Sequence, residues 1–279
     1  MEEAMNRHYK LEARLLSLCC YTAAAITFGM LLFIIGYILA KGIPHMSLDF
    51  FSRAYDSVNV SVVPSVINTI MMAAVTLLIV VPVGIGAAIY TSEYARRGSK
   101  VVKVVRITTE TLQGIPSIVY GLFGLLFFVN AMKWGQSMLA GAFTLAIMVL
   151  PVIMRTTEEA LQSVPDSYRE ASFGLGAGKL RTVIRVVLPP AVPGILSGVI
   201  LAIGRIVGET AALIYTSGTV AKIPKGLMGS GRTIALHMWV LANEGLHEDK
   251  AYATAVILLI LVIVINFLSN QLARKLASA

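Results

Sequence analysis

Long apolar runs separated by short polar segments dominate the pattern of hydrophobic and polar positions along the chain. Six runs are long enough, or nearly so, to cross a bilayer, and they lie near residues 17–40, 66–90, 112–131, 137–154, 190–215 and 252–272. Crossing about 30 Å of hydrocarbon takes about 20 residues of helix. Because backbone groups in lipid must be hydrogen-bonded within each segment, we predict an all-α integral membrane protein with about six transmembrane helices.

Composition supports a membrane protein and argues against a soluble enzyme. Of the 279 residues, 57% are hydrophobic and 14% are charged, against about 45–50% and about 25% in soluble domains. The net charge of +8 could indicate nucleic-acid binding, but the sequence has no basic stripe with interleaved aromatic residues. We therefore attribute the charge to the excess of Lys and Arg in the cytoplasmic loops of membrane proteins.

Lys and Arg are distributed unevenly between the two sides of the predicted bundle. The two terminal tails and the connections after the second and fourth runs carry about twice as many as the other connections. By the positive-inside rule, both termini are predicted to be cytoplasmic, in a multi-pass protein of the cytoplasmic (inner) membrane. We divide the chain into residues 1–59, with the first helix and first outer loop, a transmembrane domain at 60–272, and a cytoplasmic tail at 273–279.

The connection at residues 163–189 has the pattern of two short helices rather than of a passive loop. Ser163 is expected to cap the first helix, with Pro165 in its first turn. A glycine-rich stretch around Gly176 is expected to end that helix. A second short helix should follow and end at the two prolines at 189–190. Such a helix–turn–helix is expected either to pack under the bundle or to dock a partner protein.

This segment resembles the EAA loop of ABC importer permeases, whose pattern is E-A-A, three residues, G, nine residues, I, one residue, L-P. The matching positions here are Glu170, Ala171, Ser172, Gly176, Val186, Leu188 and Pro189. The spacing is kept, with two mild substitutions. The resemblance implies a type I ABC importer transmembrane domain whose coupling helix sits in a groove of a cytoplasmic ATPase. The coupling residues that it implies are Glu170, Ala171, Gly176, Leu188 and Pro189.

The coupling segment does not contain a phosphate-binding loop for ATP. With Gly178-Lys179 in place, a Walker A motif would need Gly at position 173 and Ser or Thr at position 180. Those positions hold Phe173 and Leu180. We therefore expect this chain to be a transporter subunit without enzymatic activity or cofactor of its own, and ATP and magnesium to bind a separate ATPase subunit.

Two charged residues fall inside the fifth apolar run. Arg205 and Glu209 are four residues apart, which would place them on one face of a helix. A charge in the membrane costs about 2.5–3.5 kcal/mol even on insertion scales, so the pair needs an explanation. One hypothesis is a structural ion pair that fixes helix packing. The other is that Arg205 meets an anion on a transport pathway while Glu209 positions or releases it.

Glycines in the same run are spaced for close helix packing. Gly194 with Gly198, and Gly204 with Gly208, have the small-xxx-small spacing. This spacing lets neighbouring helices approach closely in a membrane. We expect these glycines to lie at helix interfaces.

The segment GRIVGETAALIYTSG, residues 204–218, resembles the fifth-helix signature of phosphate ABC permeases. Its GETA sequence is similar to the A-type subunit rather than to its C-type partner, and the resemblance covers about residues 60–272. It implies a phosphate pathway that includes Arg205, Glu209 and Thr210. It also implies a complex with a C-type second permease, an ATPase homodimer and an extracytoplasmic phosphate-binding protein.

Other functions have weaker support from the sequence. A permease for another oxyanion, such as sulfate or molybdate, would usually lack the GET triplet beside an intramembrane Arg. A membrane-embedded enzyme would need a motif such as HExxH, GxSxG or paired intramembrane aspartates, and the sequence has none. A stand-alone secondary carrier would not need an EAA-type loop, and six helices without an inverted repeat make a small carrier.

Histidines and cysteines give no metal-binding pattern. His237 and His247 lie in the connection before the sixth run, without Cys, Asp or Glu at metal-ligand spacing. We expect both histidines to be solvated. The adjacent Cys19 and Cys20 are expected to be small apolar residues of the first helix, because no partner ligand lies near them.

Overall fold

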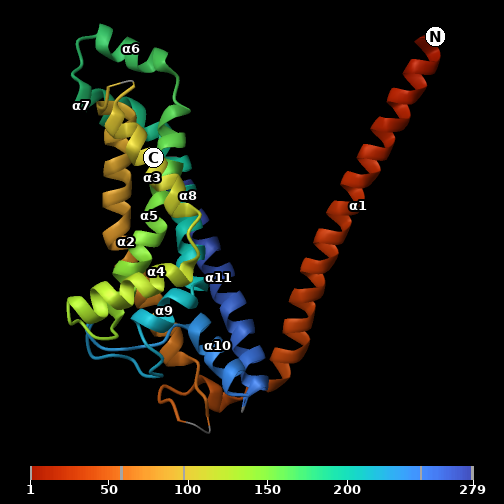
Figure 1. Ribbon diagram of the computed structural model, residues 1–279, viewed down its shortest axis with the longest axis vertical. Helices are drawn as coiled ribbons and strands as arrows, with labels where there is room; N and C mark the ends of the chain where they lie inside the picture. Colours follow the sequence, from red (N-terminus) through yellow and green to blue (C-terminus); the bar gives the residue numbers. More distant parts are fainter. Residues whose placement is uncertain (1, 57–58, 97, 246, 278–279) are drawn as a thin grey trace.

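The computed structural model describes residues 2–56, 59–96, 98–245 and 247–277. In these ranges helices are the only regular elements, which confirms the all-α prediction (Figure 1). The α-helices are α1 (Glu2–Gly42), α2 (Val63–Ile89), α3 (Lys100–Gln113), α4 (Ser117–Gly124), α5 (Met138–Gln162), α6 (Asp166–Gly174), α7 (Lys179–Thr182), α8 (Leu188–Gly208), α9 (Ala211–Thr216), α10 (Ile234–Glu244) and α11 (Glu248–Ala277). Short 3₁₀ or π turns are η1 (Ile43–His45), η2 (Leu48–Phe51), η3 (Tyr90–Tyr94), η4 (Leu125–Ala131) and η5 (Val183–Val187).

Five helical stretches are long and apolar enough to cross a membrane, and a bent pair of helices makes a sixth candidate. The bent pair is α3 with α4–η4, whose axes differ by 104°. It covers the third predicted run, which is therefore not a straight span. The break lies at residues 114–116, because the residue before a proline is disfavoured in a helix and α3 ends at Gln113.

Helices α2, α5 and α8 form the core of the bundle. Their facing sides bury large apolar side chains, among them Met72, Leu145 and Ile206. Burying these side chains holds the helices together because each interlocks with those of the neighbouring helices at the density of a packed interior. The three helices therefore form a rigid core that connects the two ends of the bundle.

One of the two predicted glycine pairs lies at a helix interface. A Cβ added to Gly198 would come within 2.7 Å of the Thr156 Cβ on α5, and one added to Gly194 would come equally close to an α5 side chain. This prediction is confirmed. At Gly204 and Gly208 nothing lies within 4 Å of an added Cβ, so the second prediction is wrong. Those glycines lie near the end of α8 and face away from the neighbouring described helices.

The helix that begins at Lys179 does not end at the two prolines at 189–190, and that prediction is wrong. It continues through the π turn η5 into α8, and the whole stretch Lys179–Gly208 is a candidate membrane span. The prolines fall in the first turn of α8. The prolines are accommodated because the preceding π turn, which ends with a hydrogen bond from the Leu188 N–H to the Val183 carbonyl oxygen, shifts the hydrogen-bond pattern at this point.

Helix α1 leans away from the bundle and meets it only near its own C-terminal end (Figure 1). At that end Gly42 packs against the α11 backbone at Tyr252, and the rings of Tyr37 and Tyr252 are 5.9 Å apart. Most of the remaining helix exposes apolar side chains, such as Phe28 and Leu32. A surface of this kind needs lipid or another apolar surface to cover it.

Candidate functional site

The predicted coupling segment forms an exposed helical hairpin at one end of the bundle (Figure 1). Between α6 and α7, Gly176 adopts a left-handed conformation with φ of +82°, which glycine accepts without strain. The hydroxyl oxygens of Ser172 and Thr182 are 2.9 Å apart and tie the two helices together. The predicted pair of helices with a glycine turn is therefore present.

The hairpin exposes apolar side chains at its tip. The five predicted coupling residues are placed as follows: Glu170, Ala171, Gly176 and Pro189 are exposed, and Leu188 is half-buried against an apolar cluster at the end of α5. Around them Leu175 is 90% exposed, Leu180 63% and Phe173 46%. An apolar patch of this kind on a rigid, protruding element is typical of a docking surface.

The start of α6 differs from the sequence prediction. Pro165 occupies the N-cap position, and Ser163 does not cap the helix, because its hydroxyl donates to the Ala160 carbonyl oxygen at 2.8 Å. Arg169 stabilises this junction instead, since its Nη1 donates to the Val164 carbonyl oxygen at 2.7 Å. The link between α5 and α6 therefore depends on a side chain that the sequence did not single out.

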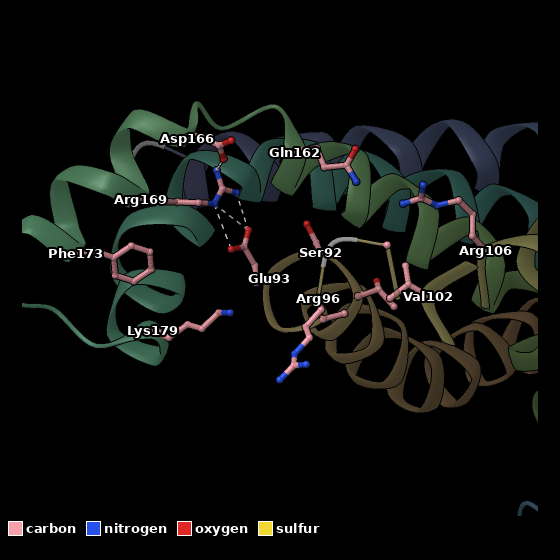
Figure 2. Close-up of a pocket in the computed structure, with 13 residues that line it drawn as sticks. Ser92, Glu93, Arg96, Val102, Arg106, Gln162, Asp166, Arg169, Phe173 and Lys179 are labelled. Carbon is pink, nitrogen blue, oxygen red and sulfur yellow. Dashed lines mark hydrogen bonds and ion pairs between the residues drawn. The ribbon is translucent and has the colours of Figure 1, made fainter. Parts of the chain in front are cut away.

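A largely buried ion pair joins the hairpin to the end of α2. Figure 2 shows Arg169 of α6 pointing toward Glu93 of η3, and its Nη2 lies 2.6 Å from the Glu93 Oε1. The two side chains are 14% and 8% exposed. Sequence analysis missed this pair because its members are 76 residues apart. The only local signal was a basic residue directly before the EAA-like Glu170.

A cavity of about 700 Å³ opens beside this ion pair (Figure 2). Arg96, Arg106 and Lys179 line it, and Figure 2 shows them spread around its rim. The Lys179 ammonium group lies 5.3 Å from the centre of the Tyr94 ring, within reach of a cation–π contact. The excess of basic groups suits this cavity to acidic side chains of a partner or to small anions.

Arg205 and Glu209 are not paired on one helix face, and that prediction is wrong. Helix α8 ends at Gly208, and Glu209 is extended, with φ of −73° and ψ of 129°. Its carboxylate accepts a hydrogen bond of 3.1 Å from the Ala212 backbone N–H at the start of α9. Both charged residues lie in the described part of the chain, and no ion pair joins them there. The free N–H groups of α9 attract the carboxylate and so compete with Arg205.

The break between α8 and α9 leaves Arg205 as a partly exposed cation within an apolar stretch. Helix α9, which follows this break, begins at Ala211. Helix α4 in turn packs tightly on α9, because a Cβ at Gly121 would come within 2.8 Å of the Ala212 Cα. The bent helix pair therefore packs against the short helix that follows the break after Arg205.

Thr210 is placed apart from this cation. It is half-buried and lines a mostly apolar cavity of about 600 Å³ between α1, α10 and α11. The three residues predicted for the substrate pathway are thus close together in the chain, but their side chains lie in different environments. Of the three, Arg205 is the one whose charge has no ion-pair partner among the described residues.

His237 is buried, and the prediction that it is solvated is wrong. It exposes none of its surface, and its ring meets the Tyr55 ring edge-on with centres 6.0 Å apart. The Arg232 guanidinium lies 4.8 Å from the centre of the same Tyr55 ring. Burial, followed by the Arg232 charge, lowers the pKa of His237 to about 3. The sequence could not show this, because Tyr55 and His237 belong to distant segments.

Comparison with known protein families gives a match over most of the chain. The model of the family described as "Binding-protein-dependent transport system inner membrane component" matches residues 80–278. The part of the chain that it covers includes the coupling hairpin, Arg205 and the last span.

Individual relatives and solved structures agree with this match. The chain is 34% identical to the probable ABC transporter permease protein YqgI of Bacillus subtilis, over 98% of each chain. It is 32% identical to the phosphate transport system permease protein PstA of Pasteurella multocida, over 95% of this chain and 96% of that one. Its fold resembles a chain of a bacterial ABC transporter involved in the import of alginate, with a TM-score of 0.66, 17% identity and 98% of each chain covered.

Proposed function

This chain belongs to the family of binding-protein-dependent transport system inner membrane components, and from that premise we propose that it is the A-type permease subunit of an ATP-driven importer of inorganic phosphate. The relation to phosphate transport is carried by the similarity to the PstA permease of Pasteurella multocida, which extends over 95% of this chain. The name of the Bacillus subtilis relative specifies an ABC transporter permease without a substrate.

Arg205 is the residue that suits the pathway for an oxyanion. Its guanidinium stays charged at all physiological pH values and can meet phosphate with two hydrogen bonds. It is partly exposed and has no carboxylate partner among the described residues. An anion arriving there does not have to displace a bound carboxylate. Glu209 contributes by capping α9, which fixes the turn after Arg205, and Thr210 completes that turn.

The hairpin of α6 and α7 is the part that would meet the ATPase. Glu170, Ala171 and Gly176 are exposed on it, and small residues beside a glycine turn allow a partner to approach closely. From the distribution of Lys and Arg, we propose that this end of the bundle lies on the cytoplasmic side, together with both termini. ATP and magnesium would bind the partner ATPase, and a short rigid helix in its groove would transmit the ATPase's motion.

The other partners follow from the premise. A C-type permease would complete the pathway, two ATPase subunits would drive it, and an extracytoplasmic phosphate-binding protein would deliver the substrate. The exposed apolar surface of α1 suits contact with lipid and with the second permease.

The experiment measures phosphate uptake into vesicles that contain the complete importer, normalised to the amount of assembled complex. Arg205→Gln is expected to lower uptake by about tenfold to 100-fold, the effect of losing hydrogen bonds to a charged group. Glu209→Gln should transport nearly normally, because an amide oxygen can still accept the Ala212 N–H. The double variant should be as inactive as Arg205→Gln.

Three results would contradict this proposal. Wild-type uptake in Arg205→Gln would remove Arg205 from the pathway. Recovery of uptake in the double variant would show that Arg205 and Glu209 act only as a structural pair. Competition of phosphate uptake by excess sulfate or molybdate, but not by phosphate analogues, would identify another oxyanion as the substrate.

A further inference from the structure

The guanidinium of Arg169 contacts two separate parts of the chain at once, besides Asp166 of its own helix. It donates to Glu93 at the end of α2, from Nη2 at 2.6 Å and from Nε at 3.2 Å. It also donates to the end of α5, with Nη2 at 2.9 Å from the Leu161 carbonyl oxygen, and to the link after α5, with Nη1 at 2.7 Å from the Val164 carbonyl oxygen. All three of its nitrogens are therefore engaged, and Arg169 itself belongs to α6.

These contacts are largely shielded from solvent, as the low exposure of both side chains shows. Direct hydrogen bonding to Glu93 raises the pKa of Arg169, so the guanidinium remains charged. Charge-assisted hydrogen bonds in such surroundings are short and directional. A displacement of α6 cannot be absorbed here by a flexible surface contact.

The elements that Arg169 contacts lead directly into the membrane. Glu93 lies in η3, which continues α2 within the unbroken span Val63–Tyr94. Leu161 lies near the end of α5, which packs against α2 in the core of the bundle. A single side chain of the hairpin, Arg169, thus contacts the ends of both α2 and α5.

We propose that Arg169 is a positioning residue for energy coupling, which transmits the movement of the α6–α7 hairpin to α2 and α5 together through Glu93 and the Leu161 and Val164 carbonyl groups. This inference rests on the proposed function, because it assumes that an ATPase moves the hairpin. It adds a route from the hairpin to the transmembrane helices. Physical coupling of this kind requires contiguous contacts between rigid elements.

The chemistry of the site predicts an order of severity among variants. In Arg169→Lys the charge remains, but one ammonium group cannot reach Glu93 and two carbonyl groups in the same fork geometry. In Glu93→Gln the arginine keeps both carbonyl contacts, and the amide oxygen can still accept one hydrogen bond. Arg169→Lys should therefore impair coupling more than Glu93→Gln, although both substitutions are conservative in size.

The test uses the complete importer, with its ATPase, second permease and binding protein, in vesicles loaded with ATP. We would measure phosphate uptake and ATP hydrolysis on the same sample. In Arg169→Lys the phosphate transported per ATP hydrolysed should fall about tenfold, within the range of energetic couplings between sites. In Glu93→Gln the same ratio should fall by less than about threefold, which is half of the tenfold loss on a logarithmic scale. Arg14→Lys, an exposed position on α1, is the matched control and should not differ from wild type.

The ratio of phosphate transported to ATP hydrolysed distinguishes a defect in coupling from a defect in folding and from a wrong choice of substrate. A purely structural role would lower the yield of assembled complex and leave the ratio of transport to hydrolysis unchanged, and that result would overturn the inference. A normal ratio in Arg169→Lys, or a larger loss in Glu93→Gln, would overturn it as well. If the wild-type complex does not transport phosphate at all, the proposed function fails instead, and the two failures are distinguishable.

Discussion

His237, Tyr55 and Arg232 form a closed group of polar side chains next to the start of α10. Arg232 is only 3% exposed, and its Nε and Nη2 have no hydrogen-bond partner among the described residues. The Val60 backbone lies by the His237 ring, but it opposes the lowering of the His237 pKa less than burial and Arg232 promote it. A second positive charge beside Arg232 would be unfavourable in these surroundings, because burial and a like charge both penalise ionisation. His237 is therefore neutral in the folded protein.

This neutrality makes stability depend on pH. The pKa of His237 is about 3 in the folded protein, against an ordinary value of 6.5. Between these values the unfolded chain binds more protons, so the free energy of unfolding falls as the pH drops below 6.5. Going from pH 7 to pH 5.5 should cost about 1 kcal/mol from this group alone. The measurement is the unfolding temperature of the purified protein in detergent at the two pH values.

The control replaces the histidine by an apolar residue of similar size. His237→Leu should show a smaller loss of unfolding temperature between pH 7 and pH 5.5 than wild type does. His247→Gln, which alters a partly exposed histidine, should keep the wild-type difference. An equal pH effect in wild type and His237→Leu would show that other groups cause it.

At the scale of elements, the turn between α6 and α7 decides the direction of the coupling hairpin. Gly176 has a positive φ, whereas Gly174, two residues earlier, ends α6 with an ordinary φ. Neither position is crowded, because nothing lies within 4 Å of an added Cβ. The two glycines therefore differ in backbone conformation and not in packing.

This difference gives a matched pair of substitutions. Gly176→Ala should strain the turn by about 1–2 kcal/mol, the usual penalty for a residue with a side chain in a left-handed conformation. Gly176→Asp should be at least as harmful at the proposed ATPase contact. We expect weaker co-purification of the ATPase with both variants, and wild-type co-purification with Gly174→Ala. Equal behaviour of Gly174→Ala and Gly176→Ala would show that the left-handed turn does not matter.

At the scale of the whole molecule, the hairpin of α6 and α7 and the segment around α10 lie at opposite ends of the bundle (Figure 1). The core helices α2, α5 and α8 connect these ends. Gly178 precedes α7 at one end, and Gly226 lies in the loop before α10 at the other, and both are exposed. If the hairpin faces the cytoplasm, these two glycines must be on opposite sides of the membrane.

Cysteine labelling tests this orientation. In a background with Cys19→Ala and Cys20→Ala, a membrane-impermeant thiol reagent added to intact cells should label Gly226→Cys and should label Gly178→Cys only after lysis. Ala279 lies outside the described residues and is predicted to be on the side of Gly178. Labelling of Gly178→Cys and Gly226→Cys from the same side would contradict the arrangement of the bundle in the membrane.

The properties that the sequence determined by itself are local ones. The length and apolarity of the runs establish a helical membrane protein, because a backbone in lipid has few other ways to satisfy its hydrogen bonds. The coupling hairpin could also be predicted, since its glycine turn and the EAA-like spacing around Glu170 are contained in about twenty residues of chain. Arg205 stood out for the same reason, as a charge within an apolar run.

The tertiary structure decided everything that depends on segments far apart in the chain. Glu93 and Arg169 are 76 residues apart, so their pairing follows only from the packing of α2 against α5. His237 looked solvated because Tyr55, which covers it, comes from before α2. Glu209 looked like a partner for Arg205, but the helix ends between them, and the free N–H groups of α9 compete for its carboxylate. Helix periodicity describes one helix at a time, whereas these outcomes depend on which neighbours each side chain meets.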